Sequence, residues 1–570
     1  MYVLEKAKEY IAEQINKALG EEFVQASSLV YPPTSDMGDL SLAGFELAKK
    51  LKQTPGETVA ELVEKIEMDD IITGVKVAGP YLNFTISKKY LVESVIKEIF
   101  KLEGKYGENE TGQEQGVMIE YSNGNTHKEY HIGHLRNISY GDAVNKILLA
   151  NGHKSIPVSY INDFGIHVAK TVWNYLTNKE KWSQRLEDKG YLLGKIYVEA
   201  NTREKEEATA KQMIQLTMKK IEARKGDEYK NWEETRKWSI EYFDKIYKEL
   251  GVRFKKTYYE SEYIDEGKKQ VDKLLEKGIL KKSDGAIIAD LEGEGLGILV
   301  VVRSDGTALY PVADIPLALE KFKKFKISRS IYVVDIRQGL YLKQLAAIIK
   351  KMGYEQEIFH LGYDFVKLPS GMMASRSGNV ITYQELKEKM FKKIIAETKE
   401  RHADWEEKKV EEVAKKIAIG AMKFEMIKVN PKNIIVFDID KALQSEGYTS
   451  AYLQYTYARI QSVIRKSKVE GPKSKVFDSE KLSEEKERGL ILKMAKYPEA
   501  VLVAGENYDP AEIAKYLFEL AQNLNDYYHA VPVLKAEEDI KKARLALLSA
   551  VSQVLKNGLT LLGVEVLEEM

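Results

Sequence analysis

Three of the chain's eight histidines lie in the segment HKEYHIGHLRN, at positions 127, 131 and 134. Imidazole groups at this spacing serve three kinds of site. They could bind a metal ion, since His131 and His134 are three residues apart and could share one face of a helix. They could instead fill a hydrophobic core, or donate hydrogen bonds to a phosphate group. Three interpretations must therefore be separated.

The neighbouring residues favour the phosphate interpretation. A metal site needs a further ligand such as Glu. The glycine between His131 and His134 contributes nothing to such a site. Core histidines would be crowded by charged neighbours such as Lys128. In contrast, Gly133 allows a flat base or a phosphate to approach bare backbone, and a helix N-terminus adds partial positive charge. We predict that His131, Gly133 and His134 face phosphates, that the protein holds no metal ion, and that His127→Ala does little.

The segment lies where a predicted strand ends and a helix begins. VMIEYS predicts a strand, HLRNISYGDAVNKILLANG a helix that ends at Gly152, and IPVSYIND a second strand. This βαβ pattern is typical of a doubly wound sheet, which binds nucleotides at the carboxyl ends of its strands. GAIIADL, GILVVVR, ALYPVAD and SIYVVDI predict further strands, and their alternation with helices supports a parallel sheet.

Composition shifts divide the chain into three regions. Residues 1–112 have an α+β pattern and end in a polar, glycine-rich linker. Residues 113–447 are α/β, with a Lys- and Glu-rich helical insertion at about 170–270, and residues 448–570 show helical periodicity. We therefore predict a multidomain fold, α/β plus all-α, with a small α+β domain first and a helical bundle last.

Composition excludes several classes of protein. The 570 residues contain no cysteine, which rules out disulfides and thiolate zinc sites. No apolar run approaches the length of a membrane helix, and the N-terminus lacks the pattern of a signal peptide, so a cytoplasmic enzyme is expected. The 87 basic and 87 acidic residues cancel. A polyanionic partner would have to bind to local patches.

Five segments carry a wider pattern: IEYSNGNTHKEYHIGHLRN, RSDGTALYPVADIPLALEKF, GMMASRSGNVITYQEL, EGYTSAYLQYTYARI and GPYLNF. Together they resemble the arginyl-tRNA synthetase family of class I aminoacyl-tRNA synthetases, and the resemblance covers nearly the whole chain. The tetrapeptide HIGH alone is less specific, because related nucleotidylyltransferases carry similar signatures. The resemblance implies a Rossmann-like class I catalytic domain over residues 113–447, with stem-contact helices after its second signature. It also implies an N-terminal additional domain and a C-terminal anticodon-binding domain.

The resemblance also implies an activity. L-arginine would react with ATP, bound with Mg²⁺, to give arginyl-adenylate, and the arginyl group would pass to the 3′ end of tRNA(Arg). We expect a monomer. Two alternatives stay open on the sequence: a catalytically inactive tRNA-binding relative, and an enzyme of the same fold that charges another amino acid. The presence of both histidines of the HIGH segment argues against the first alternative.

Family positions assign the nucleotide site. His131 and His134 would be catalytic, and the ATP-binding residues would be His131, Gly133, His134, Met373, Ser375 and Arg376. The second signature normally carries a lysine where this chain has Ser375. In the family a lysine just before the HIGH segment substitutes for it, which here is Lys128, a third catalytic residue. Read alone, ASRSGN is also typical of a surface turn.

A guanidinium group is planar and carries five donors, so its recognition calls for carboxylates and carbonyl acceptors around a flat cation. Glu120 closes the first strand, and Asp314 follows Tyr310 by four residues after another predicted strand, so both carboxylates could face one pocket. By resemblance, five residues contact arginine: Glu120, Asn125, Tyr310, Asp314 and Gln338.

Candidate tRNA contacts lie at both ends of the chain. In YLQYTYARI, aromatic and cationic residues share one helical face, which could stack unpaired bases or belong to the core. Resemblance favours RNA contact for Tyr455 and Arg459, together with Met570 at the C-terminus. It likewise assigns Tyr81 and Asn83 of GPYLNF to the tRNA elbow, although Ala78 stands where some members have a polar residue.

Overall fold

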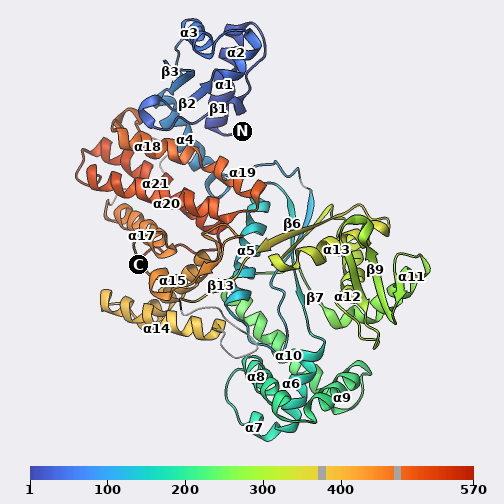
Figure 1. Ribbon diagram of the computed structural model, residues 1–570. Coiled ribbons are helices and arrows are strands. Elements are labelled where there is room, and N and C mark those ends of the chain that lie inside the picture. Colours follow the sequence, from blue (N-terminus) through green and yellow to red (C-terminus); the bar gives the residue numbers. More distant parts are fainter. Residues whose placement is uncertain (114, 370–380, 468–476) are drawn as a thin grey trace.

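The structure is a computed structural model that describes residues 1–113, 115–369, 381–467 and 477–570. Figure 1 shows three regions: a small α+β unit at the N-terminus, a central α/β unit, and a helical bundle at the C-terminus. This arrangement confirms the predicted fold class. Among the described residues, no helix is long and apolar enough to cross a membrane.

The central sheet consists of five parallel strands in the order β12-β11-β5-β6-β7. Its strands are β5 (Gly116–Glu120), β6 (Lys154–Ile161), β7 (Lys256–Tyr259), β11 (Arg329–Asp335) and β12 (Glu357–Tyr363). Helix α5 (Ile132–Ala150) connects β5 to β6, and α13 (Gly339–Lys351) connects β11 to β12. The strand order reverses between β5 and β11. Doubly wound sheets bind ligands at the carboxyl edge of such a switch point.

Alternate residues of β5 pack on opposite faces of the sheet. Val117 and Ile119 join the core that contains α5. Met118 joins a second core with residues of α12 (Pro311–Phe325) and α13. Because strand side chains alternate, Glu120 points to the same face as Met118, toward α12. The sheet thus separates the side that carries the HIGH helix from the side that carries Asp314.

Two of the predicted strands lie outside this sheet. β9 (Ala286–Leu291) and β10 (Gly297–Val302) pair with each other antiparallel, and β8 (Lys281–Ser283) completes a separate three-stranded sheet. The prediction that they belong to the parallel sheet is wrong. The connection between β9 and β10 is too short for a parallel crossover, which needs a dozen or more residues.

The predicted strand ALYPVAD is also wrong, because it contains the start of α12. Pro311 occupies the first helical position, where its fixed φ suits a helix and its missing N–H is no loss. Asp314 consequently lies in the first turn of a helix and does not follow a strand.

A helical lobe separates β6 from β7. It contains α6 (Ile166–Thr177), α7 (Lys179–Ser183), α8 (Lys189–Glu206), α9 (Ala210–Glu222) and α10 (Gly226–Glu249). Figure 1 shows the lobe below the carboxyl edge of the sheet. Trp173 and Trp232 belong to a core of its own, whereas Phe243 near the end of α10 packs in the main core. Helix α10 therefore fixes the lobe to the central unit.

The N-terminal unit is an antiparallel sheet, in the order β1-β2-β4-β3, covered by helices. Its strands are β1 (Leu29–Val30), β2 (Leu40–Ala43), β3 (Ile72–Ala78) and β4 (Tyr81–Ile86), and its helices are α1 (Val3–Leu19), α2 (Phe45–Leu51), α3 (Pro55–Lys65) and α4 (Lys88–Leu102). The predicted turn between two strands at Gly79 and Pro80 is confirmed. Gly79 has a φ of 58°, which glycine adopts without strain.

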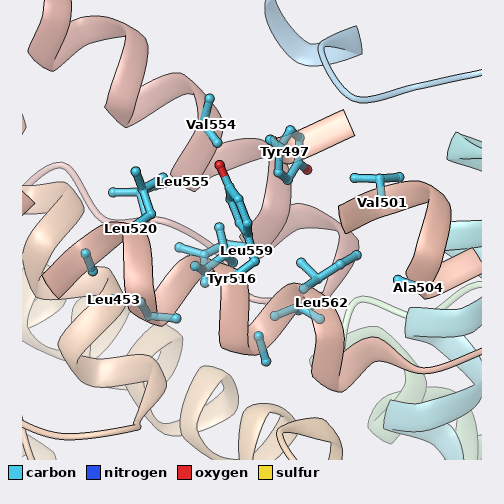
Figure 2. Packing of buried hydrophobic residues seen from close by; sticks show 14 of the residues in the cluster. Leu453, Tyr497, Val501, Ala504, Tyr516, Leu520, Val554, Leu555, Leu559 and Leu562 are labelled. Carbon is cyan, nitrogen blue, oxygen red and sulfur yellow. The ribbon is translucent and has the colours of Figure 1, made fainter. Parts of the chain in front are cut away.

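The C-terminal part is helical, apart from β14 (Ile435–Val436), which pairs with β13 (Val366–Lys367). Its longer helices are α14 (Tyr383–Arg401), α15 (Glu407–Ile427), α17 (Ser450–Ser467), α18 (Glu485–Ala495), α19 (Tyr497–Asn507), α20 (Pro510–Ala530) and α21 (Glu538–Leu561). Figure 2 shows Leu520 of α20 packed near Leu555 and Leu559 of α21. The buried Tyr516 hydroxyl is satisfied, since it donates to the carbonyl of Lys493 at 2.6 Å.

Candidate active site

The two histidines of the HIGH segment cap α5. The backbone N–H of Gly133 donates to Nδ1 of His131 at 3.1 Å, and the backbone N–H of His131 donates to Nδ1 of His134 at 3.2 Å. The two rings stack with their centroids 3.8 Å apart. Because both Nδ1 atoms accept hydrogen bonds, each neutral ring carries its proton on Nε2. The structure thus brings together the three residues predicted to face phosphates.

Both rings are neutral at pH 7. Burial, assisted by the charge of Lys128, lowers the pKa of His131 to about 4. Burial and its neighbour His131 hold the pKa of His134 well below the usual value. Each ring therefore offers one N–H donor and does not serve as a proton donor in its charged form. Such donors suit a negative charge that grows during a reaction.

Lys128 lies on the side of this site that faces the helical lobe. Its Nζ is 5.2 Å from the ring centroid of Tyr197 on α8. Its charge lowers the pKa of both His131 and His134, which places it near the two rings. A cation at this position adds to the positive potential of the helix N-terminus.

The predicted nucleotide contacts Met373, Ser375 and Arg376 lie outside the described residues. The residues that follow this segment are nevertheless held against the HIGH segment. The backbone N–H of Tyr383 donates to the carbonyl of Tyr130 at 2.7 Å, and the N–H of Ile132 donates to the carbonyl of Ile381 at 3.3 Å. The C-terminal end of the second signature is therefore beside the first.

His127 is a core residue. Its Nδ1 pairs with the Thr126 hydroxyl at 2.9 Å and its Nε2 with the Thr235 hydroxyl of α10 at 2.8 Å. Its backbone N–H donates to Oγ of Ser239, also on α10, at 3.0 Å. Burial lowers its pKa to about 3. This environment argues against the expectation that His127→Ala does little, since a buried unpaired hydroxyl costs about 1–3 kcal/mol.

The two predicted carboxylates lie close together at the carboxyl edge. Glu120 is only 2% exposed and pairs with the buried ammonium group of Lys321. Asp314 accepts a hydrogen bond from the hydroxyl of Tyr341 on α13. Burial, together with the charge of Glu120, raises the pKa of Asp314 to about 6. Tyr310 precedes Asp314 at the helix start and is 64% exposed.

The sequence reasoning missed a third carboxylate, Glu260. It follows β7 directly and is 8% exposed, and its Oε2 has no hydrogen-bond partner among the described residues. Burial, with the charges of Asp314 and Asp163, raises its pKa to about 8. An acidic residue directly after a strand was an available signal. An acceptor kept buried without a donor is typical of a ligand site.

The two predicted amides also lie at this edge. Asn125 follows β5 and forms an isolated bridge with Asn162, which follows β6. Gln338 is exposed and directly precedes α13, after the end of β11. The five predicted arginine contacts thus come from the ends of β5 and β11 and the start of α12.

The predicted anticodon residues lie on α17 and at the C-terminus. Tyr455 is 40% exposed. Arg459 donates to Oδ1 of Asn525 at 3.2 Å and lies 4.1 Å from the ring centroid of Tyr528. Met570 is partly buried and lines a small pocket at the ends of α14 and α15. Aromatic and cationic groups therefore do share one surface of the bundle.

The two predicted elbow residues differ in exposure. Tyr81 is 41% exposed and meets the exposed ring of Phe45 edge to face, with their centroids 6.1 Å apart. Asn83, two residues along β4, is only 4% exposed. Tyr81 is thus available to a partner, whereas a contact from the Asn83 side chain would need a local rearrangement.

Comparison with known proteins matches three family models in chain order. These are the arginyl tRNA synthetase N-terminal domain at residues 5–86, the catalytic domain of class I (R) tRNA synthetases at residues 95–439, and the DALR anticodon binding domain at residues 453–570. The resemblance inferred from the signature segments is confirmed.

Curated relatives match over nearly the full length. An arginine–tRNA ligase of Bdellovibrio bacteriovorus is 37% identical over 95% of this chain and 94% of its own. One of Clostridium botulinum is 32% identical over 99% of this chain and all of its own. The solved Thermus thermophilus arginyl-tRNA synthetase superposes with a TM-score of 0.79 at 26% identity, covering 99% of this chain and 100% of that one.

Proposed function

The chain belongs to the class I arginyl-tRNA synthetases, and from that membership we propose which of its residues carry out each step. The enzyme is an aminoacyl-tRNA ligase that uses ATP to attach arginine to tRNA(Arg).

We propose that the α-phosphate of ATP binds at the N-terminus of α5. The Nε2–H groups of His131 and His134 donate to its oxygens as the arginine carboxylate attacks phosphorus and pyrophosphate leaves. Lys128 balances the charge of the leaving pyrophosphate in place of the lysine that Ser375 replaces. The support is the neutral, Nδ1-accepting state of both histidines at a helix N-terminus.

The metal ion belongs to the nucleotide in this proposal. Over the described part of the chain, no three His, Asp or Glu side chains gather as a set that could hold a metal ion. We propose that Mg²⁺ enters on the ATP phosphates, where it would neutralise their charge and keep several of its waters, as this ion usually does at nucleotide sites.

Arginine recognition rests on the buried carboxylates at the switch point. Asp314 and Glu260 are assigned to the guanidinium group, because the charge of Asp314 raises the pKa of Glu260 and Glu260 has an oxygen without a donor among the described residues. Tyr310, Asn125 and Gln338 surround the same edge and are assigned to the rest of the substrate. Glu120, which the resemblance also placed among the arginine contacts, is assigned instead to the buried pair with Lys321. This buried carboxyl cluster at the carboxyl edge of the sheet is the observation that carries the proposal.

The outer domains are assigned to tRNA. Residues 448–570 would hold the anticodon loop through Tyr455, Arg459 and Met570, and residues 1–112 would contact the elbow through Tyr81. Because one chain carries all three regions, we propose that the enzyme is a monomer. We also propose that it acts in the cytoplasm.

An amino-acid panel in the ATP–pyrophosphate exchange assay tests this function, with and without tRNA(Arg). Arginine should support exchange at least about 10³-fold better than lysine or citrulline, since a site built for hydrogen bonds rejects analogues that leave it unpaired. Equal exchange with lysine would favour an enzyme for another amino acid. Tight tRNA binding with no exchange in either condition would favour the inactive relative.

The carboxyl cluster also predicts a pH dependence. Below pH 6 both Asp314 and Glu260 hold protons, because their pKa values are raised to about 6 and about 8. A bound guanidinium ion favours the ionised forms, so arginine binding releases protons below pH 8. The KM for arginine should fall roughly tenfold or more from pH 6 to pH 8 and then level off.

Exchange rates at varied arginine across this pH range measure the effect. Calorimetry in two buffers of different ionisation heat counts the protons released. The KM for ATP serves as the internal control, because His131 and His134 stay neutral throughout. A KM for arginine that does not change between pH 6 and pH 8 would contradict the assignment.

A further inference from the structure

A buried ion pair lies beneath the proposed arginine site. The side chains of Lys321 and Glu120 are 0% and 3% exposed, and the ammonium group contacts Oε2 of Glu120. Nζ of Lys321 also lies 3.4 Å from the Tyr332 hydroxyl and 4.6 Å from the centroid of that ring. The centroid of the Tyr258 ring is 5.7 Å away. The ammonium group is thus enclosed by one carboxylate and two aromatic rings.

The sheet register explains this enclosure. Tyr332 of β11 and Glu120 of β5 are directly paired in the parallel ladder, so their side chains share one face. Helix α12 covers that face and brings Lys321 to it. Burying a lysine and a glutamate is costly even when they pair, and an apolar pair of similar size is often as stable. The stability of the folded protein therefore does not explain why Lys321 and Glu120 are present as a buried ion pair.

The helix also connects the pair to the substrate side. Asp314 and Lys321 are seven residues apart on α12, about two turns, and so lie on the same side of the helix. The negative charge of Glu120 opposes ionisation of Asp314, and the positive charge of Lys321 favours it. Asp314 also interacts with the carboxyl group of Glu260 and with tyrosine hydroxyls, those of Tyr160, Tyr310, Tyr332 and Tyr341.

We propose that Lys321 is a positioning residue for arginine recognition: its ammonium group balances Glu120, so that Asp314 keeps a negative charge for the guanidinium group of the substrate. Lys321 acts through Glu120 and Asp314 and does not touch arginine. The inference rests on the proposed assignment of Asp314 to the guanidinium group. Lys321 thereby supplies an internal cation near three carboxyl groups, those of Glu120, Asp314 and Glu260.

Lys321→Met tests the inference. Glu120 then lacks its cation, and the charge that remains disfavours ionisation of Asp314. We expect the KM for arginine at pH 7 to rise at least about tenfold, with kcat at saturating arginine changed much less. The fall in KM with rising pH should move toward higher pH by about one unit. Lys321→Arg, which keeps the positive charge, should partly restore both quantities.

The double variant Lys321→Met with Glu120→Gln separates charge balance from structural damage. It removes both charges, leaves no unpaired buried ion, and should therefore return the pH profile to that of the wild type. Lys256→Met is the matched control. Lys256 pairs with Glu320 of α12 at 2.9 Å and lies 4.4 Å from the centroid of the Tyr258 ring, but its side chain is 30% exposed.

The outcomes distinguish this inference from the function on which it rests. Wild-type enzyme without arginine-dependent exchange would overturn the function itself. An active wild type whose Lys321→Met variant keeps the same KM and pH profile would overturn the inference alone. The inference would also fail if the double variant kept the shifted profile of the single variant, or if Lys256→Met shifted the profile equally.

Discussion

His134→Ala is expected to slow arginine activation by about 10²–10³-fold while the KM for arginine stays near the wild-type value. In the proposed mechanism the Nε2–H group of His134 donates to an oxygen whose charge grows only in the transition state. Losing one such donor typically costs about 3–4 kcal/mol in the barrier. Single-turnover formation of arginyl-adenylate at saturating ATP, arginine and tRNA(Arg) measures the effect directly.

The choice of variants matters, because His134 also caps α5 through its Nδ1. His134→Gln keeps an acceptor for the His131 N–H and a donor on the same side chain, so we expect it to regain part of the lost rate. His134→Asn keeps only a short side chain and should stay slow while its melting temperature recovers. A rate that follows the melting temperature across the three variants would assign His134 to helix capping alone.

The control should not be another histidine of the same segment. His127 is bonded to α10 through Thr235, so its replacement is expected to loosen the helical lobe. His529, exposed at the end of α20, is suitable for an activation assay at saturating tRNA. A loss in His529→Ala similar to that in His134→Ala would point to a general effect on folding.

Asp314→Asn is expected to lower kcat/KM for arginine by about 10³-fold, with most of the loss in KM. Removing one partner of a buried charge pair typically costs about 2–5 kcal/mol, because the other charge stays buried without compensation. Pyrophosphate exchange with arginine and lysine gives the selectivity as well as the affinity. An enzyme built for another amino acid would keep its arginine-to-lysine ratio in this variant.

The stability of the same variant provides an independent check. Because folding raises the pKa of Asp314 above its ordinary value, the ionised carboxylate destabilises the folded state at neutral pH. Asp314→Asn should therefore leave the melting temperature at pH 7 unchanged or higher. Asp290→Asn, on the separate antiparallel sheet where Asp290 pairs with Lys281, is the matched control and should change neither selectivity nor KM. A large drop in the melting temperature of Asp314→Asn would make Asp314 a structural residue.

Local patterns predicted much of this protein without a structure. The strand before HIGH, the helix after it, the second strand and the turn at Gly79 are each encoded within about twenty consecutive residues. Hydrophobic periodicity and capping residues act over that range, so these elements can be recognised from the sequence. The HIGH segment was predictable for the same reason, since His131, Gly133 and His134 meet within a single turn at a helix start.

The arginine site depended on tertiary structure. Glu120, Glu260 and Lys321 come from β5, from the end of β7 and from α12, and the helical lobe separates the first two along the chain. Their proximity follows from the strand order, in which β7 lies two places from β5. No local pattern encodes that order, so Glu260 and the role of Lys321 were not predicted.

The same reason explains the misassigned strands. ILVVV and ALYPVAD have strand-like composition, yet one pairs in a separate hairpin and the other begins a helix at Pro311. By itself, the sequence determined the family, the βαβ unit and the pair of histidines at the start of its helix, because these depend on neighbours in the chain. Only the tertiary structure decided which carboxylates lie near one another and which cation pairs with Glu120, because burial and charge coupling depend on neighbours in space.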